Sequence, residues 1–183
     1  MDWGTLIATA SGGFIAMAGT VLVDGLRSRQ EVRHSASDRR RDVYTEFISA
    51  AGVAHARLRV TARAPDAEPD PAGAARAALV GAALHEVRER LFIEASPAVA
   101  GAGQAMFERL RALERVVASG AAQESPAFHR AHHPYLEAVW AYRAAVRREL
   151  GGRTMGPGVF GWAEWDGSDR CPLCRDGLPA APE

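Results

Sequence analysis

Hydrophobic residues open the chain as one uninterrupted stretch. Residues 3–23 carry no charge, and Leu, Ile, Val and Phe are spread there among Gly, Ala, Ser and Thr. A helix needs about 20 predominantly apolar residues to cross the hydrocarbon core of a bilayer. We therefore predict a transmembrane helix over residues 1–26. A cleaved signal peptide is disfavoured because no basic segment precedes the stretch, and a soluble helix would need a polar face.

The pattern changes twice after this stretch. Residues 27–42 are almost wholly polar and form an Arg-rich neck, whereas residues 43–64 place apolar side chains at helical spacing. Such spacing predicts a helix with one buried face. No Pro occurs before Pro65. The first helix can therefore continue from the membrane through the neck to about residue 64.

Three further helices are predicted where a capping residue is followed by Pro, because Pro favours the first turn of a helix. The three signals are Asp70-Pro71, Ser96-Pro97 and Ser125-Pro126. The helices predicted from them cover residues 71–95, 97–120 and 126–150. Pro134 is expected to kink the last helix or to move its start, because Pro has no backbone N–H to donate within a helix.

No segment alternates apolar and polar residues as a strand would, so the predicted fold class is all-α. Short connections favour antiparallel neighbours, and residues 43–150 are predicted to form a cytosolic antiparallel bundle of about four helices. Residues 151–183 are rich in Gly, Pro and Asp and predict a flexible tail. Trp162 and Trp165 in this tail are expected to dock on the bundle, on the membrane interface or on a partner.

The net charge says little about function, but the positions of the charged residues along the chain predict topology. The 22 basic residues are all Arg and are balanced by 22 acidic ones, and the absence of Lys and Asn is typical of a GC-rich genome. A balanced charge disfavours a general nucleic-acid binder. Six arginines follow the predicted span: Arg27, Arg29, Arg33, Arg39, Arg40 and Arg41. Arg-rich flanks mark the cytoplasmic side of a span, which predicts a cell-membrane protein with its N-terminus outside, and the same arginines suit anionic lipid headgroups.

Small residues recur along the predicted span at every fourth position. They are Gly4, Ala8, Gly12, Ala16 and Thr20. Such a stripe lets two membrane helices approach closely, which predicts a homodimer or oligomer seam. Gly and Ala are abundant throughout this chain, so chance remains the alternative explanation.

The strongest chemical motif is Cys171-Pro172-Leu173-Cys174 in the tail. Two thiolates on a tight turn resemble half of a tetrahedral zinc site. The other two ligands could come from a second protomer or from histidines near residue 130. His129 and His133 would align on an unbroken helix, but Pro134 biases His133 away from helical geometry. His129 and His132 are therefore the histidines predicted alongside the cysteines; unliganded thiols and a thiol redox pair are the alternatives.

Enzyme signatures are missing. The sequence contains no phosphate-binding Gly loop, no Ser nucleophile elbow and no His-Glu-x-x-His motif. We therefore predict no enzyme activity and no cofactor other than zinc.

A short span and an Arg-rich neck are followed by Arg39-Arg40-Arg41-Asp42-Val43-Tyr44-Thr45-Glu46-Phe47, which open an Ala-rich helix. This arrangement resembles small single-pass membrane proteins of unknown function in actinobacteria. The resemblance covers about residues 3–62 and implies the same topology and location, but no chemistry.

Three functions remain as hypotheses. The first is a membrane-anchored interaction or scaffold module with an unknown protein partner. The second is a zinc-binding or thiol-based module that uses Cys171 and Cys174. The third is an oligomeric membrane protein, of channel or holin type, that assembles through the small-residue stripe.

Overall fold

The computed structural model describes residues 37–175. Residues 37–63 form the first helix, followed by α2 (Pro71–Val80), α3 (Leu84–Glu94), α4 (Pro97–Ala118) and α5 (Pro126–Glu149). The predicted all-α class is confirmed for this part of the chain, which contains no strand. Among these residues, no helix is both long and apolar enough to cross a membrane. The predicted span and its small-residue stripe lie outside the described residues.

The three Pro start signals act as helix caps. Side-chain oxygens of Asp70, Ser96 and Ser125 accept hydrogen bonds from backbone N–H groups in the first turns of α2, α4 and α5. In each case Pro occupies the first turn, where its missing N–H has no intrahelical partner to lose. The predicted starts of these three helices are therefore confirmed.

The single helix predicted over residues 71–95 is wrong, because the structure breaks it into α2 and α3. Gly81 and Ala82 form a turn, and Ala83 adopts a left-handed conformation with φ 50°. Gly is a poor helix former. The turn changes the direction of the chain, so that Leu79 and Leu84 are both buried. Val80, which the helical pattern placed on the buried face, is 64% exposed.

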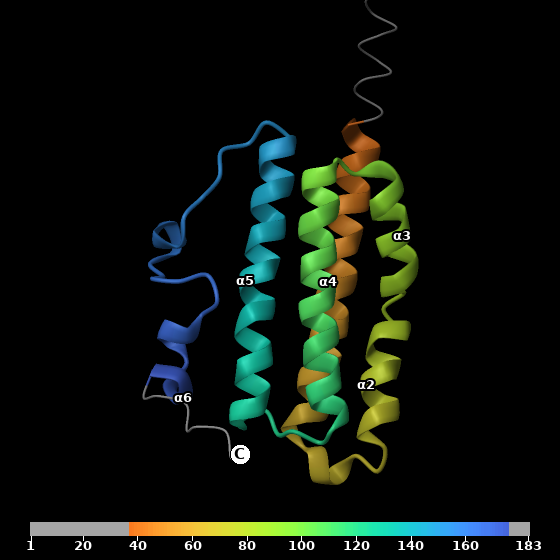
Figure 1. Cartoon of the computed structure of the whole chain (residues 1–183), viewed down its shortest axis with the longest axis vertical. Coiled ribbons are helices and arrows are strands. Elements are labelled where there is room, and N and C mark those ends of the chain that lie inside the picture. Colours follow the sequence, from red (N-terminus) through yellow and green to blue (C-terminus); the bar gives the residue numbers. More distant parts are fainter. Residues whose placement is uncertain (1–36, 176–183) are drawn as a thin grey trace, which may run out of the picture. The chain divides into compact units, whose positions relative to one another are not determined.

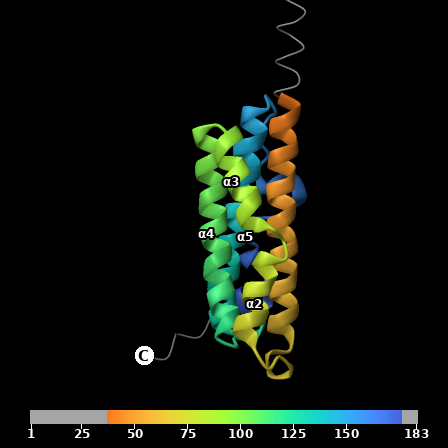
Figure 2. The ribbon, with the colours of Figure 1, turned by 90° about the vertical axis from the view of Figure 1, so that its right-hand side faces the viewer.

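The four long segments form an up-down-up-down bundle (Figure 1). The first helix, α4 and α5 run along its length, while α2 and α3 are stacked end to end as the second segment (Figure 2). Hydrogen bonds join the first helix to α5: the hydroxyls of Tyr135 and Tyr142 donate to the carbonyls of Ala51 (3.3 Å) and Tyr44 (3.2 Å). The buried core includes Phe47, Leu58, Leu91, Met106, Leu110 and Phe128.

Close packing in this core depends on one glycine. Gly103 is buried in α4, and a methyl group at its Cα would lie 2.4 Å from a terminal carbon of Leu91 and 3.3 Å from Phe47. The absence of a side chain therefore lets α3 and the first helix approach α4 closely.

Helix α5 runs continuously through Pro134. The alternative that Pro134 moves the start of the helix is wrong, because the Ser125 cap places the first residue at Pro126. His133, directly before Pro134, is helical and buried.

The tail from residue 151 to Arg175 has short helical turns at η2 (Pro157–Phe160), η3 (Ser168–Arg170) and α6 (Pro172–Arg175). It lies alongside α5 (Figure 1). Trp165 stacks on Trp140 of α5 with ring centroids 4.1 Å apart, and Trp162 and Phe160 complete an aromatic cluster. The prediction that the tail tryptophans dock on the bundle is confirmed, whereas a flexible tail is not confirmed for residues 151–175.

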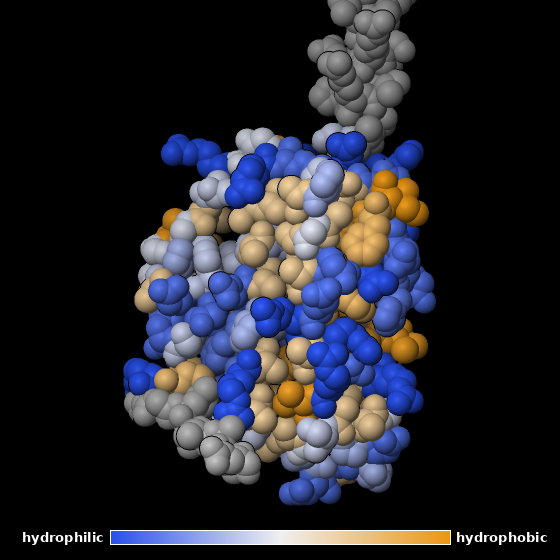
Figure 3. All heavy atoms as spheres, in the orientation of Figure 1, coloured by the Kyte–Doolittle hydropathy of each residue, from blue (hydrophilic) through white to orange (hydrophobic). Residues whose placement is uncertain are grey.

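Polar and weakly apolar side chains are interspersed on the face shown in Figure 3. Strong apolar colour appears along the edge formed by α2 and α3 and at smaller separate spots elsewhere on this face (Figure 3). Val80, Phe92 and Ile93 from these helices are exposed. Arg39, Arg40 and Arg41 of the predicted neck are also exposed, and they are already helical.

Candidate metal centre

Four side chains with metal-binding atoms converge between α5 and the tail. They are His129, His133, Cys171 and Cys174, and their ligand atoms all lie within 4.8 Å of one another. No other group of three or more His, Cys, Asp or Glu side chains in residues 37–175 could hold a metal ion.

Local structure explains how each pair is formed. Because α5 continues without interruption, His129 and His133 are one helical turn apart and share a face. The cysteines occupy a tight turn in which the Cys171 carbonyl accepts from the N–H groups of Cys174 (3.2 Å) and Arg175 (2.9 Å). This turn brings the two thiols to the same side of the tail.

Four of the six distances between ligand atoms lie within about 0.5 Å of those around a tetrahedral zinc ion. His129 Nδ1 lies 3.4 Å from His133 Nε2 and 3.3 Å from Cys171 Sγ. Cys174 Sγ lies 3.1 Å from His133 Nε2 and 3.7 Å from His129 Nδ1. Zinc bonds of about 2.0–2.1 Å to nitrogen and about 2.3 Å to sulfur give tetrahedral edges of about 3.3 Å between nitrogens and about 3.6 Å between nitrogen and sulfur. The residues therefore fit such an ion.

A contact outside the group fixes the orientation of the His133 imidazole. His133 Nδ1 lies 2.7 Å from the carbonyl oxygen of Asp166, so this nitrogen donates and Nε2 presents a lone pair to the group. A backbone carbonyl on the outer nitrogen is the usual way in which proteins orient a metal-binding histidine.

A loop in the tail positions the Asp166 carbonyl. The Asp166 side chain accepts from the N–H (2.9 Å) and the hydroxyl (2.8 Å) of Ser168. Between them, Gly167 is buried and has φ 73°, a conformation that favours glycine. The loop therefore holds a specific backbone oxygen against His133.

Electrostatics in the metal-free group favour neutral ligands. Burial, together with neighbouring Cys171 and Asp166, raises the pKa of the Cys174 thiol to about 11. Burial and neighbouring His133 lower the pKa of His129. Neutral imidazoles are ready to bind a cation, whereas the thiol must lose its proton on binding, so metal affinity would rise with pH.

The same electrostatics argue against thiol redox chemistry. A reactive thiol has a lowered pKa because the thiolate is the nucleophile. The Cys174 pKa is shifted the other way.

The structure brings together three of the four predicted ligands: Cys171, Cys174 and His129. It brings in His133 in place of His132. The prediction of His132 over His133 was wrong because capping at Ser125 and packing of α5 keep the chain helical up to Pro134. The His132 ring instead stacks on Phe128 and on His55, with centroids 5.3 and 5.1 Å apart.

A hollow of about 250 Å³ adjoins the group, lined in part by Arg59, Leu136 and Arg170. Four protein ligands leave no open position on a tetrahedral ion, which is typical of structural rather than catalytic zinc. The arrangement is therefore suited to joining the tail to α5.

No known protein family, curated protein or solved structure matches this chain. Its fold and its candidate site are therefore interpreted from their own geometry.

Proposed function

We propose that this chain is a membrane-anchored helical bundle whose C-terminal tail is held against α5 by a structural zinc ion. The observation that carries the zinc proposal is the tetrahedral spacing of His129 Nδ1, His133 Nε2 and the two thiols. Two nitrogens and two sulfurs form a ligand set that zinc commonly takes.

Each ligand has a distinct part in this proposal. His129 and His133 provide the rigid half of the site, because they belong to a long helix packed in the core. Cys171 and Cys174 provide the half that belongs to the tail, since they reach the site only when the tail lies along α5. Zinc would then contribute binding energy to tail docking, as in small domains that fold around a structural ion. The proposal includes no catalytic step.

Metal analysis of the purified full-length chain tests the zinc proposal. We expect one zinc per chain, and substitution of cobalt should give the visible absorption of tetrahedral thiolate coordination. Cys171→Ser should weaken binding by at least about 100-fold. His85→Gln is the control, because His85 is exposed on α3 and far in sequence from the group. Zinc below about 0.1 per chain, or equal affinity in the Cys171→Ser variant, would contradict the proposal.

Membrane anchoring rests on the uncharged stretch at residues 3–23 and on the arginines that follow it. Zinc binding and anchoring are independent, so each can fail alone. The full-length chain should sediment with membranes and resist extraction by carbonate, whereas a variant lacking residues 1–26 should not sediment. A soluble full-length chain would contradict anchoring. The stripe through Gly12 gives the oligomeric alternative, which predicts that Gly12→Leu abolishes self-association.

The exposed apolar edge of α2 and α3 supports a role as an interaction module. Ile93 is 80% exposed and Val80 is 64% exposed, and apolar patches on a surface often mark binding sites for proteins. Ile93→Asp should remove the partner from crosslinked complexes if this edge binds it, while leaving zinc content unchanged.

A further inference from the structure

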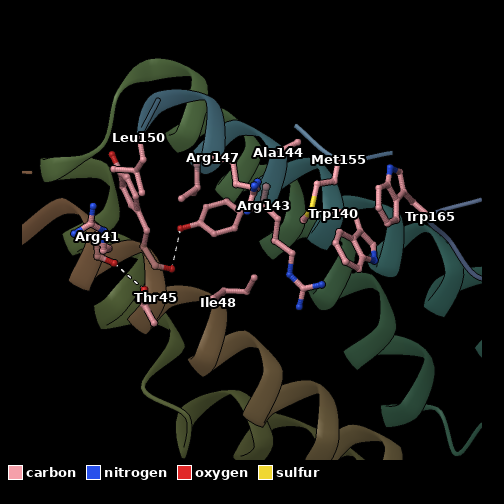
Figure 4. Close-up of a pocket in the computed structure, with 13 residues that line it drawn as sticks. Arg41, Thr45, Ile48, Trp140, Arg143, Ala144, Arg147, Leu150, Met155 and Trp165 are labelled. Atoms are coloured by element: carbon pink, nitrogen blue, oxygen red, sulfur yellow. Dashed lines mark hydrogen bonds between the residues drawn. The ribbon is translucent and has the colours of Figure 1, made fainter. Parts of the chain in front are cut away.

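A second hollow in the bundle has the character of a small-molecule site. It lies between the first helix, the C-terminal half of α5 and the tail, and it has a volume of about 330 Å³ (Figure 4). Ile48, Val146 and Leu150 form apolar walls, and the tail contributes Met155 and Trp165. Ligand pockets are commonly about 300–1,000 Å³ and mostly apolar with a few polar groups.

The charged side chains that line this pocket are all positive. They are Arg41, Arg143 and Arg147, and within the described part of the chain no Asp or Glu lines it. The nearby carboxylate of Glu149 is engaged elsewhere: it accepts from the hydroxyls of Tyr44 (2.7 Å) and Ser96 and lies 3.6 Å from Arg40. The field inside the pocket therefore favours an anion.

Arg143 is the cation best placed to bind that anion. Its guanidinium lies over the Trp140 ring, 4.3 Å from the centroid, and Figure 4 shows its side chain extending between Ile48 and Trp140. Partial burial of the guanidinium lowers the pKa of Arg143. No carboxylate among residues 37–175 forms an ion pair with it. Arg143 is exposed at this pocket, and a guanidinium without a carboxylate partner gains a charge-assisted hydrogen bond when an anion arrives.

We propose that this pocket binds a small amphiphilic carboxylate. Its short alkyl or aromatic tail lies against Ile48, Val146, Leu150 and Met155, and its carboxylate pairs with Arg143. A neutral analogue loses the ion pair, and a cationic analogue is repelled. The pocket can exist without zinc or membrane anchoring, because Arg143, Ile48, Val146 and Leu150 belong to the packed bundle, whereas only Met155 and Trp165 belong to the tail.

Calorimetric titration of the purified full-length chain with octanoate tests this proposal. We expect one octanoate per chain, bound at least about tenfold more tightly than octan-1-ol, and no binding of octyltrimethylammonium. Trp140 and Trp165 border the pocket, so their fluorescence should change with octanoate at the same concentrations. Equal affinity for octanol, or no octanoate binding up to about 10 mM, would overturn the proposal.

Two variants place the ligand in the pocket. Arg143→Gln should weaken octanoate binding at least about tenfold while leaving octanol binding unchanged. Arg109→Gln, an exposed position on α4, is the matched control and should bind octanoate as the parent does. Ala144→Phe should block the pocket to both ligands, which keeps the test decisive if Arg143→Gln unfolds. Unchanged octanoate binding in a folded Arg143→Gln or Ala144→Phe variant would also overturn the proposal.

Discussion

His133 illustrates how a single residue links the bundle to the tail through its two ring nitrogens. Nδ1 faces the Asp166 carbonyl at 2.7 Å, and Nε2 faces the Cys174 sulfur at 3.1 Å. Both partners belong to the tail, whereas the His133 ring is buried against the bundle. The orientation of one imidazole therefore couples the loop at residues 166–168 to the candidate metal centre.

Gly167→Ala should weaken zinc binding about tenfold, because the added Cβ strains a left-handed residue and shifts the carbonyl that orients His133. The Cβ would lie 3.0 Å from the Arg170 guanidinium. Gly161→Ala is the matched control: Gly161 has φ 69° in the same tail but has open space around it. Competition with a chelator measures both affinities, and equal losses in the two variants would contradict a specific role for the Asp166 carbonyl.

His55 gives a prediction about acid stability. Burial lowers its pKa to about 4, with Arg59 as a lesser cause, whereas the unfolded chain has the ordinary value of about 6.5. The unfolded state therefore binds the proton first as pH falls. The free energy of unfolding should decrease by up to about 3 kcal/mol between pH 6.5 and 4 from this residue.

Chemical denaturation in the presence of a chelator measures this decrease without a contribution from zinc. His55→Phe should reduce the pH dependence, since it removes one titrating ring but retains aromatic contact with Tyr135. The dependence should not vanish, because burial also lowers the pKa of the neighbouring His132, to about 3. His85→Gln, at an exposed position, should leave it unchanged. An identical pH profile for His55→Phe and the parent would show that His55 is not the source.

At the scale of elements, the end of one helix and the start of the next are set by different kinds of information. Caps at Asp70, Ser96 and Ser125 are local, because each side chain bonds to an N–H three residues later. The break between α2 and α3 is not set by a hydrogen bond between near neighbours in the sequence. It joins two short helices so that Leu79 and Leu84 both reach the core, and only the shape of that core determines where the turn falls.

Packing between elements predicts very different effects of the same substitution at two glycines of α4. Gly103→Val should lower the free energy of unfolding by about 1–3 kcal/mol, because its side chain would collide with Leu91 and Phe47. Gly101→Val should change it by less than about 0.5 kcal/mol, since Gly101 has open space around it and Val is a slightly better helix former than Gly. Thermal or urea denaturation measures both. Equal stability of the two variants would mean that α3 and α4 do not pack closely at Gly103.

At the scale of the whole molecule, the tail is held against α5 at two places. The aromatic cluster around Trp140 lies at one place and the Cys–His group at the other, and Trp165 is one residue from the carbonyl that His133 contacts. The tail also lines the pocket through Met155 and Trp165. Release at the metal centre should therefore disturb both the cluster and the pocket.

Removal of zinc should consequently weaken octanoate binding about three- to tenfold and shift Trp emission to longer wavelength as the cluster becomes hydrated. Coupling between two sites is reciprocal, so octanoate should raise zinc affinity by the same factor. The prediction requires both proposed sites to exist. Unchanged octanoate affinity in the chelated protein, with both ligands shown to bind, would mean that the aromatic contacts alone hold the tail.

The sequence by itself determined what depends on near neighbours in the chain. The spacing of apolar residues identified the helical regions but not the break between α2 and α3. Three capping residues with Pro identified three helix starts, and the Cys-Pro-Leu-Cys turn identified half of the metal group. These features can be predicted from the sequence because helical periodicity and capping act over three or four residues.

Tertiary structure decided which distant groups meet. It selected His133 instead of His132, because α5 remains helical up to Pro134 and its rotation directs one ring to the tail and the other to Phe128 and His55. It also packed the tail on Trp140 and formed, from three separate segments, a pocket whose charged lining residues are all arginines. The physical reason is that such contacts follow from the packing of whole helices, and a local pattern of residues does not specify that packing.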